Sequence, residues 1–162
     1  MSRSTDILSM YRTGCEFSDC ADFAMKAQDI VPFHGLFYSV PAIVNSAFAC
    51  EVFLKLLLEM EQIEIRRSHQ LEELFDQLPE KVKTAIQKST IQKCGTWTDM
   101  FGLNLLHQIS DALVQWRYNY EHDFGKDGTM KIEFGFLVAF RNALREKCGD
   151  YFRDHMMDLR SC

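Results

Sequence analysis

Residues 41–61 read PAIVNSAFACEVFLKLLLEME, a stretch that is apolar on nearly every side when it is wound as a helix. Proline suits the first turn of a helix, because its missing N–H would have no partner there. The polar side chains Glu51, Lys55 and Glu59 form a single stripe at every fourth position. A helix that is apolar all round is covered by neighbours, so this stretch predicts the central helix of a domain.

The helical period recurs along most of the chain, with apolar residues at every third or fourth position. Only three prolines and eight glycines occur in 162 residues, so long stretches are free of helix breakers. We expect Ser18 and Asp19 to cap the first helix. Long helices are expected at residues 16–31, 41–61, 99–121 and 133–157, and shorter ones at 71–75 and 79–91. The prediction is all-α: an up-and-down bundle of four long helices plus short connecting helices, in a single domain over residues 1–162.

Apolar stripes on these helices indicate which side chains fill the core. Those expected to be buried are Phe48, Leu54, Leu106, Leu113, Trp116 and Leu144. The six cysteines include no Cys-x-x-Cys pair, and none of the five histidines stands four positions from another. Such spacing favours reduced thiols that act as small core residues, and it gives little support for a zinc site. We therefore expect no metal and no cofactor.

The charge and hydropathy of the sequence indicate its expected location and its expected binding partners. The formal net charge is −5, whereas proteins that hold nucleic acid through many phosphate contacts usually carry a basic face. Residues 1–11 lack the apolar run of a signal peptide. The apolar run 52–58 is broken by Lys55 and is shorter than the ~18 residues of a membrane span. We expect a cytoplasmic protein that does not enter a membrane and is no general binder of polyanions.

Three segments match one known family in their order and spacing. They are NSAFACEVFLK at residues 45–55, SHQLEELF at 68–75 and WRYNYEH at 116–122. The first is similar to the family's Ala-x-Glu-x-x-x-Lys helix and the second to its His-x-Leu-x-x-Leu segment. The third is similar to an Arg-Tyr segment late in a long helix. Over about residues 15–125 the chain thus resembles the HEPN domains, a family of small helical bundles.

The resemblance implies one of two roles. Active HEPN members are metal-independent ribonucleases, often toxins or defence effectors, and their site is usually shared by two subunits. They carry an Arg followed, after four to six residues, by a His. Members without such a pair are non-catalytic modules that bind nucleotides, RNA or protein. The expected partners are a second copy of the chain, RNA, and a cognate antitoxin or a nucleotidyltransferase-like protein.

Arg117 and His122 fit the ribonuclease pattern, with four residues between them. A histidine, whose ordinary pKa is about 6.5, moves protons to or from a 2′-hydroxyl, and an arginine forms a cationic fork for phosphate. On a regular helix the two side chains point about 140° apart, so they converge only at a helix end or between subunits. Since the chain is acidic, an RNA site would be local and completed by two subunits.

The same segment also allows a non-catalytic interpretation. Arg117 stands one turn before Glu121 and can pair with it. Tyr118 occupies the position where active members often have Asn, which favours the non-catalytic role. Tyr118 also lies off the apolar stripe, so it is the candidate for stacking on a base, and Asn119 follows it as a supporting residue.

Two further groups are expected to support this site. Glu51 and Lys55 form either a partly buried ion pair or a group that orients Arg117. His69 is expected to be a cap-like or core hydrogen-bonding residue, and a catalytic base is its less favoured role.

An Arg-Asn pair in the last helix, Arg141 and Asn142, also resembles the opening of the active motif. The positions where a His would follow hold Glu146, Lys147 and Cys148. This pair is therefore expected to lie on a surface turn of the last helix and to take no part in acid–base chemistry.

Overall fold

The computed structural model describes residues 6–30, 39–65, 67–95, 97, 99–117 and 133–158. Side chains are described within these ranges except at residues 28–30, 99–101, 112–117 and 155–158. The described ranges contain helices and no strand, which confirms the predicted all-α fold. The helices are α1 (Ile7–Ile30), α2 (Ser39–Met60), α3 (Leu71–Asp76), α4 (Glu80–Cys94), α5 (Asp99–Arg117) and α6 (Phe134–Asp158).

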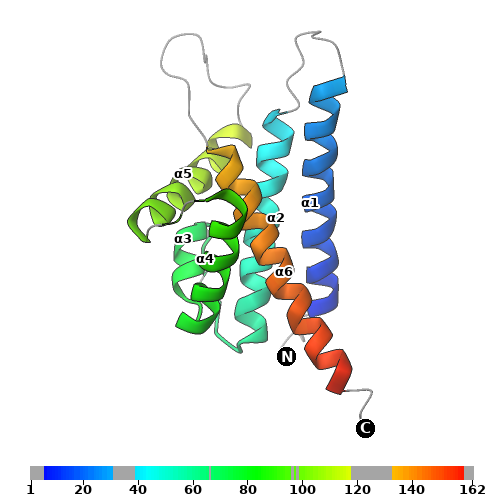
Figure 1. Cartoon of the computed structure of the whole chain (residues 1–162), viewed down its shortest axis with the longest axis vertical. Helices are drawn as coiled ribbons and strands as arrows, with labels where there is room; N and C mark the ends of the chain where they lie inside the picture. The colour runs from blue at the N-terminus through cyan, green and yellow to red at the C-terminus, as the bar shows by residue number, and fades with distance from the viewer. Residues whose placement is uncertain are drawn as a thin grey trace.

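The long helices run alternately up and down the bundle (Figure 1). Figure 1 shows α1 at one edge, antiparallel to α2 and α6, with α3, α4 and α5 on the other side. α2 packs against α1, α3, α5 and α6, whereas α4 packs mainly against α6. α2 is therefore the central helix, as the sequence predicts.

The burial of α2 follows from its composition. By length and composition it would be able to cross a membrane, since its most apolar stretch has a mean hydropathy of 1.6. In the bundle 61% of that stretch is buried by the neighbouring helices. Glu51 is the one charged side chain buried along α2.

The predicted core is confirmed in part. Leu54, Leu106 and Leu144 are fully buried. Phe48 is only partly buried, and its ring packs edge-on against Phe17 with 4.5 Å between centroids. Two further core predictions, Leu113 and Trp116, lie outside the described side chains.

An aromatic cluster that was not predicted forms part of the core. Trp97, on the connector between α4 and α5, lies 5.3 Å from Phe136 and 5.8 Å from Phe140 between ring centroids. Phe75 of α3 lies 5.5 Å from Trp97 and 5.8 Å from Phe140. Aromatic pairs at such distances add to the stability of a core beyond the area that they bury. The cluster joins α3, the connector and α6.

The predicted start of the first helix was wrong. α1 begins at Ile7, where Asp6 Oδ1 accepts the backbone N–H groups of Leu8 and Ser9 at 3.1 Å. A carboxylate at this place satisfies donors that have no partner inside the helix. Ser18 and Asp19 lie in the middle of α1 and do not cap it.

Gly14 explains how α1 can approach α2 so closely. A Cβ atom at this position would lie 2.5 Å from Cε1 of Phe53, whose ring is fully buried. Glycine in a helix interior costs up to about 1 kcal/mol relative to alanine. Here the missing side chain makes room for the Phe53 ring.

We predict that Gly14→Ala lowers the free energy of unfolding by about 1–3 kcal/mol, the usual cost of overpacking a core. The clash must exceed the gain in helix propensity, which is at most about 1 kcal/mol. Urea denaturation followed by circular dichroism measures the change. Gly135→Ala is the matched control, because a Cβ there meets nothing within 4 Å. Equal stabilisation of both variants would contradict the packing argument.

Candidate functional site

Glu51 joins two of the segments on which the family resemblance rests. It is 4% exposed on α2. Its Oε1 atom accepts a hydrogen bond from Lys55 Nζ at 2.7 Å and lies 2.8 Å from His69 Nδ1. The predicted ion pair between Glu51 and Lys55 is thereby confirmed, and His69 is a further partner. Oε2 of Glu51 is buried and has no partner within the described part of the chain.

His69 projects from the connector between α2 and α3. Because the Glu51 oxygen accepts, the Nδ1 atom of His69 carries the hydrogen, and Nε2 is left for another partner. The side chain is 77% exposed, so the expectation of a core residue was wrong, whereas its hydrogen bonding is confirmed. The connector runs along the surface, and only the Nδ1 edge of the ring reaches inward.

The start of α3 is held by Ser68. Its hydroxyl accepts the backbone N–H of Gln70 at 3.1 Å and donates to Glu73 at 2.5 Å. The cap-like role that was expected of His69 therefore falls to its neighbour. The last residues of the connector are thus held by Glu51 of α2, through His69, and by Glu73 of α3, through Ser68.

The predicted catalytic pair lies at the edge of the described structure. Arg117 is the last residue of α5, and its side chain is outside the described part. Tyr118, Asn119, Glu121 and His122 also lie outside it. The proposed orientation of Arg117 by Glu51 thus stays a prediction.

The surface position predicted for Arg141 was wrong. This side chain is 1% exposed on α6 and donates from Nη1 to Ser46 of α2 at 2.9 Å. Its Nη2 atom donates to Asp22 of α1 at 2.5 Å. Arg141 stands four positions after Leu137 and three before Leu144, both fully buried, so it shares the buried face of α6. Arg141 therefore ties three helices together.

A second arginine extends this network towards the surface. Arg145, one turn after Arg141, donates to Asp19 of α1 at 2.7 Å. The signal in the sequence was the i, i+4 pair of arginines on a helix otherwise rich in buried residues. The Nε atom of Arg141 is buried and has no partner among the described residues. A buried cation needs a paired carboxylate, so this network is a structural bond between α1 and α6.

His107 forms another polar cluster, between α3 and α5. Its Nδ1 atom lies 2.6 Å from Glu72, and its Nε2 atom lies 3.4 Å from Asp111. The hydrogen bond to Glu72 and the charge of Asp111 raise the pKa of His107. Ser110 of α5 completes the contact, because its hydroxyl accepts the backbone N–H of Leu71 at 2.8 Å.

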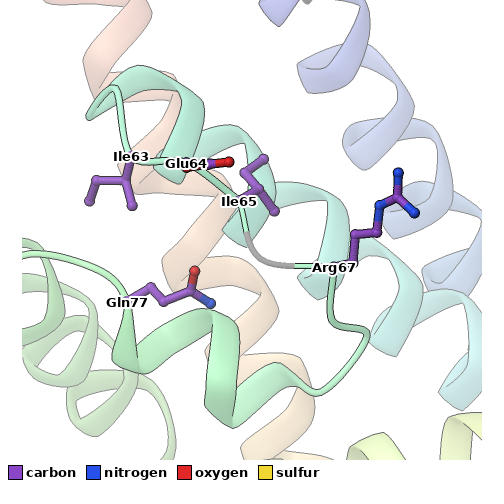
Figure 2. Close-up of a pocket in the computed structure, with 5 residues that line it drawn as sticks. All are labelled: Ile63, Glu64, Ile65, Arg67 and Gln77. Atoms are coloured by element: carbon purple, nitrogen blue, oxygen red, sulfur yellow. The ribbon is translucent and has the colours of Figure 1, made fainter.

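A hollow lies beside the same connector as His69. Its volume is about 720 Å³, and Figure 2 shows its lining residues. They are Ile63, Glu64, Ile65, Arg67 and Gln77. Arg67 and Glu64 are exposed and Ile63 and Ile65 are only partly buried, so this is a surface depression without a buried charged group.

The described side chains include no group that would bind a metal ion, and two of the cysteines lie in the core. Within those ranges no three His, Cys, Asp or Glu residues lie close enough to hold a metal ion. Cys50 and Cys148 are buried, as small core residues would be. Burial raises the pKa of the Cys50 thiol to about 12, which keeps it protonated and unreactive.

Comparisons with protein-family models, with curated proteins and with solved structures find no match to this chain.

We predict that Glu51→Ala loosens the connector before α3. The substitution removes the acceptor of both Lys55 and His69, and loss of such hydrogen bonds should cost about 1–3 kcal/mol. Hydrogen exchange should become faster at residues 63–70 but stay unchanged in α4. Glu59→Ala on the same helix is the comparison. Equal exchange rates in Glu51→Ala and the parent would show that the contact does not hold the connector.

We also predict a pH dependence that originates at His107. Its pKa is raised in the fold, so its contribution to stability is complete below the ordinary pKa of about 6.5 and is lost as the pH rises through the raised value. His107→Gln keeps a polar group but does not titrate. Between pH 6 and pH 9 the parent should therefore lose more stability than the variant, as measured by urea denaturation. Parallel curves for the two proteins would contradict the assignment.

Proposed function

We propose that this chain is a HEPN-type domain that cuts single-stranded RNA without a metal ion and acts as a two-fold homodimer. The observation that carries the proposal is the meeting of two motif segments at one buried carboxylate. Lys55 and His69 both bind Oε1 of Glu51, although 18 positions separate His69 from Glu51. Residues from two of the three segments that carry the resemblance thus meet at one contact.

The third motif segment follows directly from α5. Arg117 ends this helix, and α5 packs against α2, which carries Glu51. Figure 1 shows the C-terminal end of α5 at the same end of the bundle as the start of α6. A helix end is the place where Arg117 and His122 can escape the 140° separation of a regular helix.

The proposed reaction is transfer of the phosphodiester to the neighbouring 2′-oxygen. The 2′-hydroxyl gives up its proton to one His122 as its oxygen bonds to phosphorus. The bond from phosphorus to the 5′-oxygen breaks, and the protonated His122 of the second copy supplies a proton to that leaving oxygen. Arg117 neutralises the charge that grows on the phosphate. The products are a 2′,3′-cyclic phosphate and a 5′-hydroxyl.

A second function, that of a non-catalytic binding module, is favoured by the ion pairing of the cations. A surface that holds RNA needs positive charges that are free to meet phosphates. Six lysine and arginine side chains in the described ranges are instead bound to carboxylates. They are Lys55, Lys83, Lys93, Arg141, Arg145 and Arg153.

Cleavage of a labelled single-stranded RNA in the presence of a chelator tests the proposal. We expect the parent to cut and His122→Ala to be slower by about 10²–10⁴-fold, the usual worth of a positioned acid or base. His107→Ala is the matched control, because His107 is exposed on α5 but is not part of the Arg-x4-His pattern. The control should cut like the parent.

Two results would favour the binding module. One is equal cleavage by the parent and by a folded, dimeric His122→Ala variant, which would point to a contaminating nuclease. The other is no cleavage by either protein. Arg117→Ala is less informative, because Arg117 is also the expected partner of Glu121 or Glu51, and its loss would disturb the site itself.

A further inference from the structure

α1 has an outer face that no other described helix covers. It packs along α2 and briefly against α6, and it lies at the edge of the bundle (Figure 1). Phe23 on this face is 69% exposed, more than Leu8 and Ile91, the other large apolar side chains that are exposed among those the structure describes. Cys20 and Lys26 are exposed beside it. One exposed Phe is ordinary on a protein surface, so its surroundings decide whether it matters.

A shallow hollow of about 170 Å³ lies next to the Phe23 ring. Its lining residues are Asp19, Asp22, Phe23 and Lys26. Arg145 binds Asp19 at 2.7 Å, and Arg141 binds Asp22 at 2.5 Å. The two arginines hold the aspartates in place. Because both aspartates remain about half exposed, their oxygen atoms can still bind a partner.

Lys26 lines the same hollow and also approaches the ring. Its Nζ atom is 5.9 Å from the centroid of Phe23, the distance of a cation–π contact. Along this face of α1 an acidic, an aromatic and a basic side chain therefore follow one another. Asp19 stands four positions before Phe23, and Lys26 stands three positions after it.

This order is self-complementary under two-fold symmetry. When two α1 helices pack antiparallel about an axis at Phe23, each residue before Phe23 faces one at the same distance after it. Lys26 then faces Cys20, and Asp19 is one residue further, or about 1.5 Å along the axis. Lys26 of each copy thus reaches Asp19 of the other, and the two rings meet between these pairs. A closed two-fold dimer requires a patch of this kind, in which the same surface serves both subunits.

We propose that the outer face of α1, centred on Phe23, is the surface on which a second copy of this chain binds. Phe23 of each copy enters the hollow beside Phe23 of the other, and Lys26 pairs with Asp19 across the interface. The inference rests on the proposed homodimer but not on RNA cleavage.

Sedimentation equilibrium of the full chain at tens of micromolar tests this surface. We expect a dimer for the parent and an affinity at least about tenfold lower for Phe23→Ala and for Lys26→Glu. Ile91→Ala and Lys88→Glu, which change an exposed apolar and an exposed basic residue on α4, are the matched controls and should dimerise like the parent. Because Phe23 is exposed, Phe23→Ala should unfold at the parent's temperature.

Cross-linking gives a second measurement. The two copies of Cys20 would stand six positions apart along the antiparallel pair, or about 9 Å. A short bis-maleimide should therefore join the subunits of the parent but not those of Cys20→Ser, and joining should be weaker in Phe23→Ala. A parent that sediments as a monomer, or dimers that are indifferent to Phe23 and Lys26, would overturn the proposal.

The two proposals fail in different ways. RNA cleavage by a dimer that is indifferent to Phe23 and Lys26 would remove this interface and leave the ribonuclease in place. A dimer that depends on Phe23 but cuts no RNA would support the interface and remove the ribonuclease.

Discussion

The hydrogen bonds of Glu51, a buried carboxylate on the central helix, are the interaction on which the positions of the connector and of α3 depend. α2 is apolar on nearly every side, so the bundle has to cover it with four other helices. A carboxylate in such a place is costly unless it is bonded. Oε1 of Glu51 binds Lys55 from its own helix and His69 from the connector. The same contact holds the connector against α2 and thereby places α3, against which α5 packs.

Periodicity is a local property, and the features that depend on it were predictable. The apolar run of α2 and the regular spacing in the other helices are enough to predict an all-α bundle with α2 at its centre. The pair Glu51 and Lys55 is also local, since four positions on a helix bring two side chains together. The contact between Glu51 and His69 spans 18 positions and depends on the path of the connector, which no local pattern encodes.

The wrong predictions arose because burial depends on contacts between helices, which a local pattern does not show. Sequence patterns show which residues are apolar but not how many neighbours cover a helix. Arg141 is charged, yet it lies on the buried face of α6, where it binds Ser46 of α2 and Asp22 of α1. Likewise, Gly14 weakens the helical signal near the start of α1, and only the position of the Phe53 ring explains why glycine stands there. The predicted pair Arg117 and His122 lies at or beyond the last described residue of α5.

The bond between Arg141 and Asp22 has a consequence for how this chain can diverge. The two residues stand 119 positions apart, and the buried guanidinium would be left uncompensated if the carboxylate alone were lost. An apolar residue at position 141 would in turn leave Asp22 without its cation. The two positions should therefore be inherited as a pair, kept together or exchanged together. Paired substitution at these two positions would therefore identify related bundles even where the rest of their helical sequence has diverged.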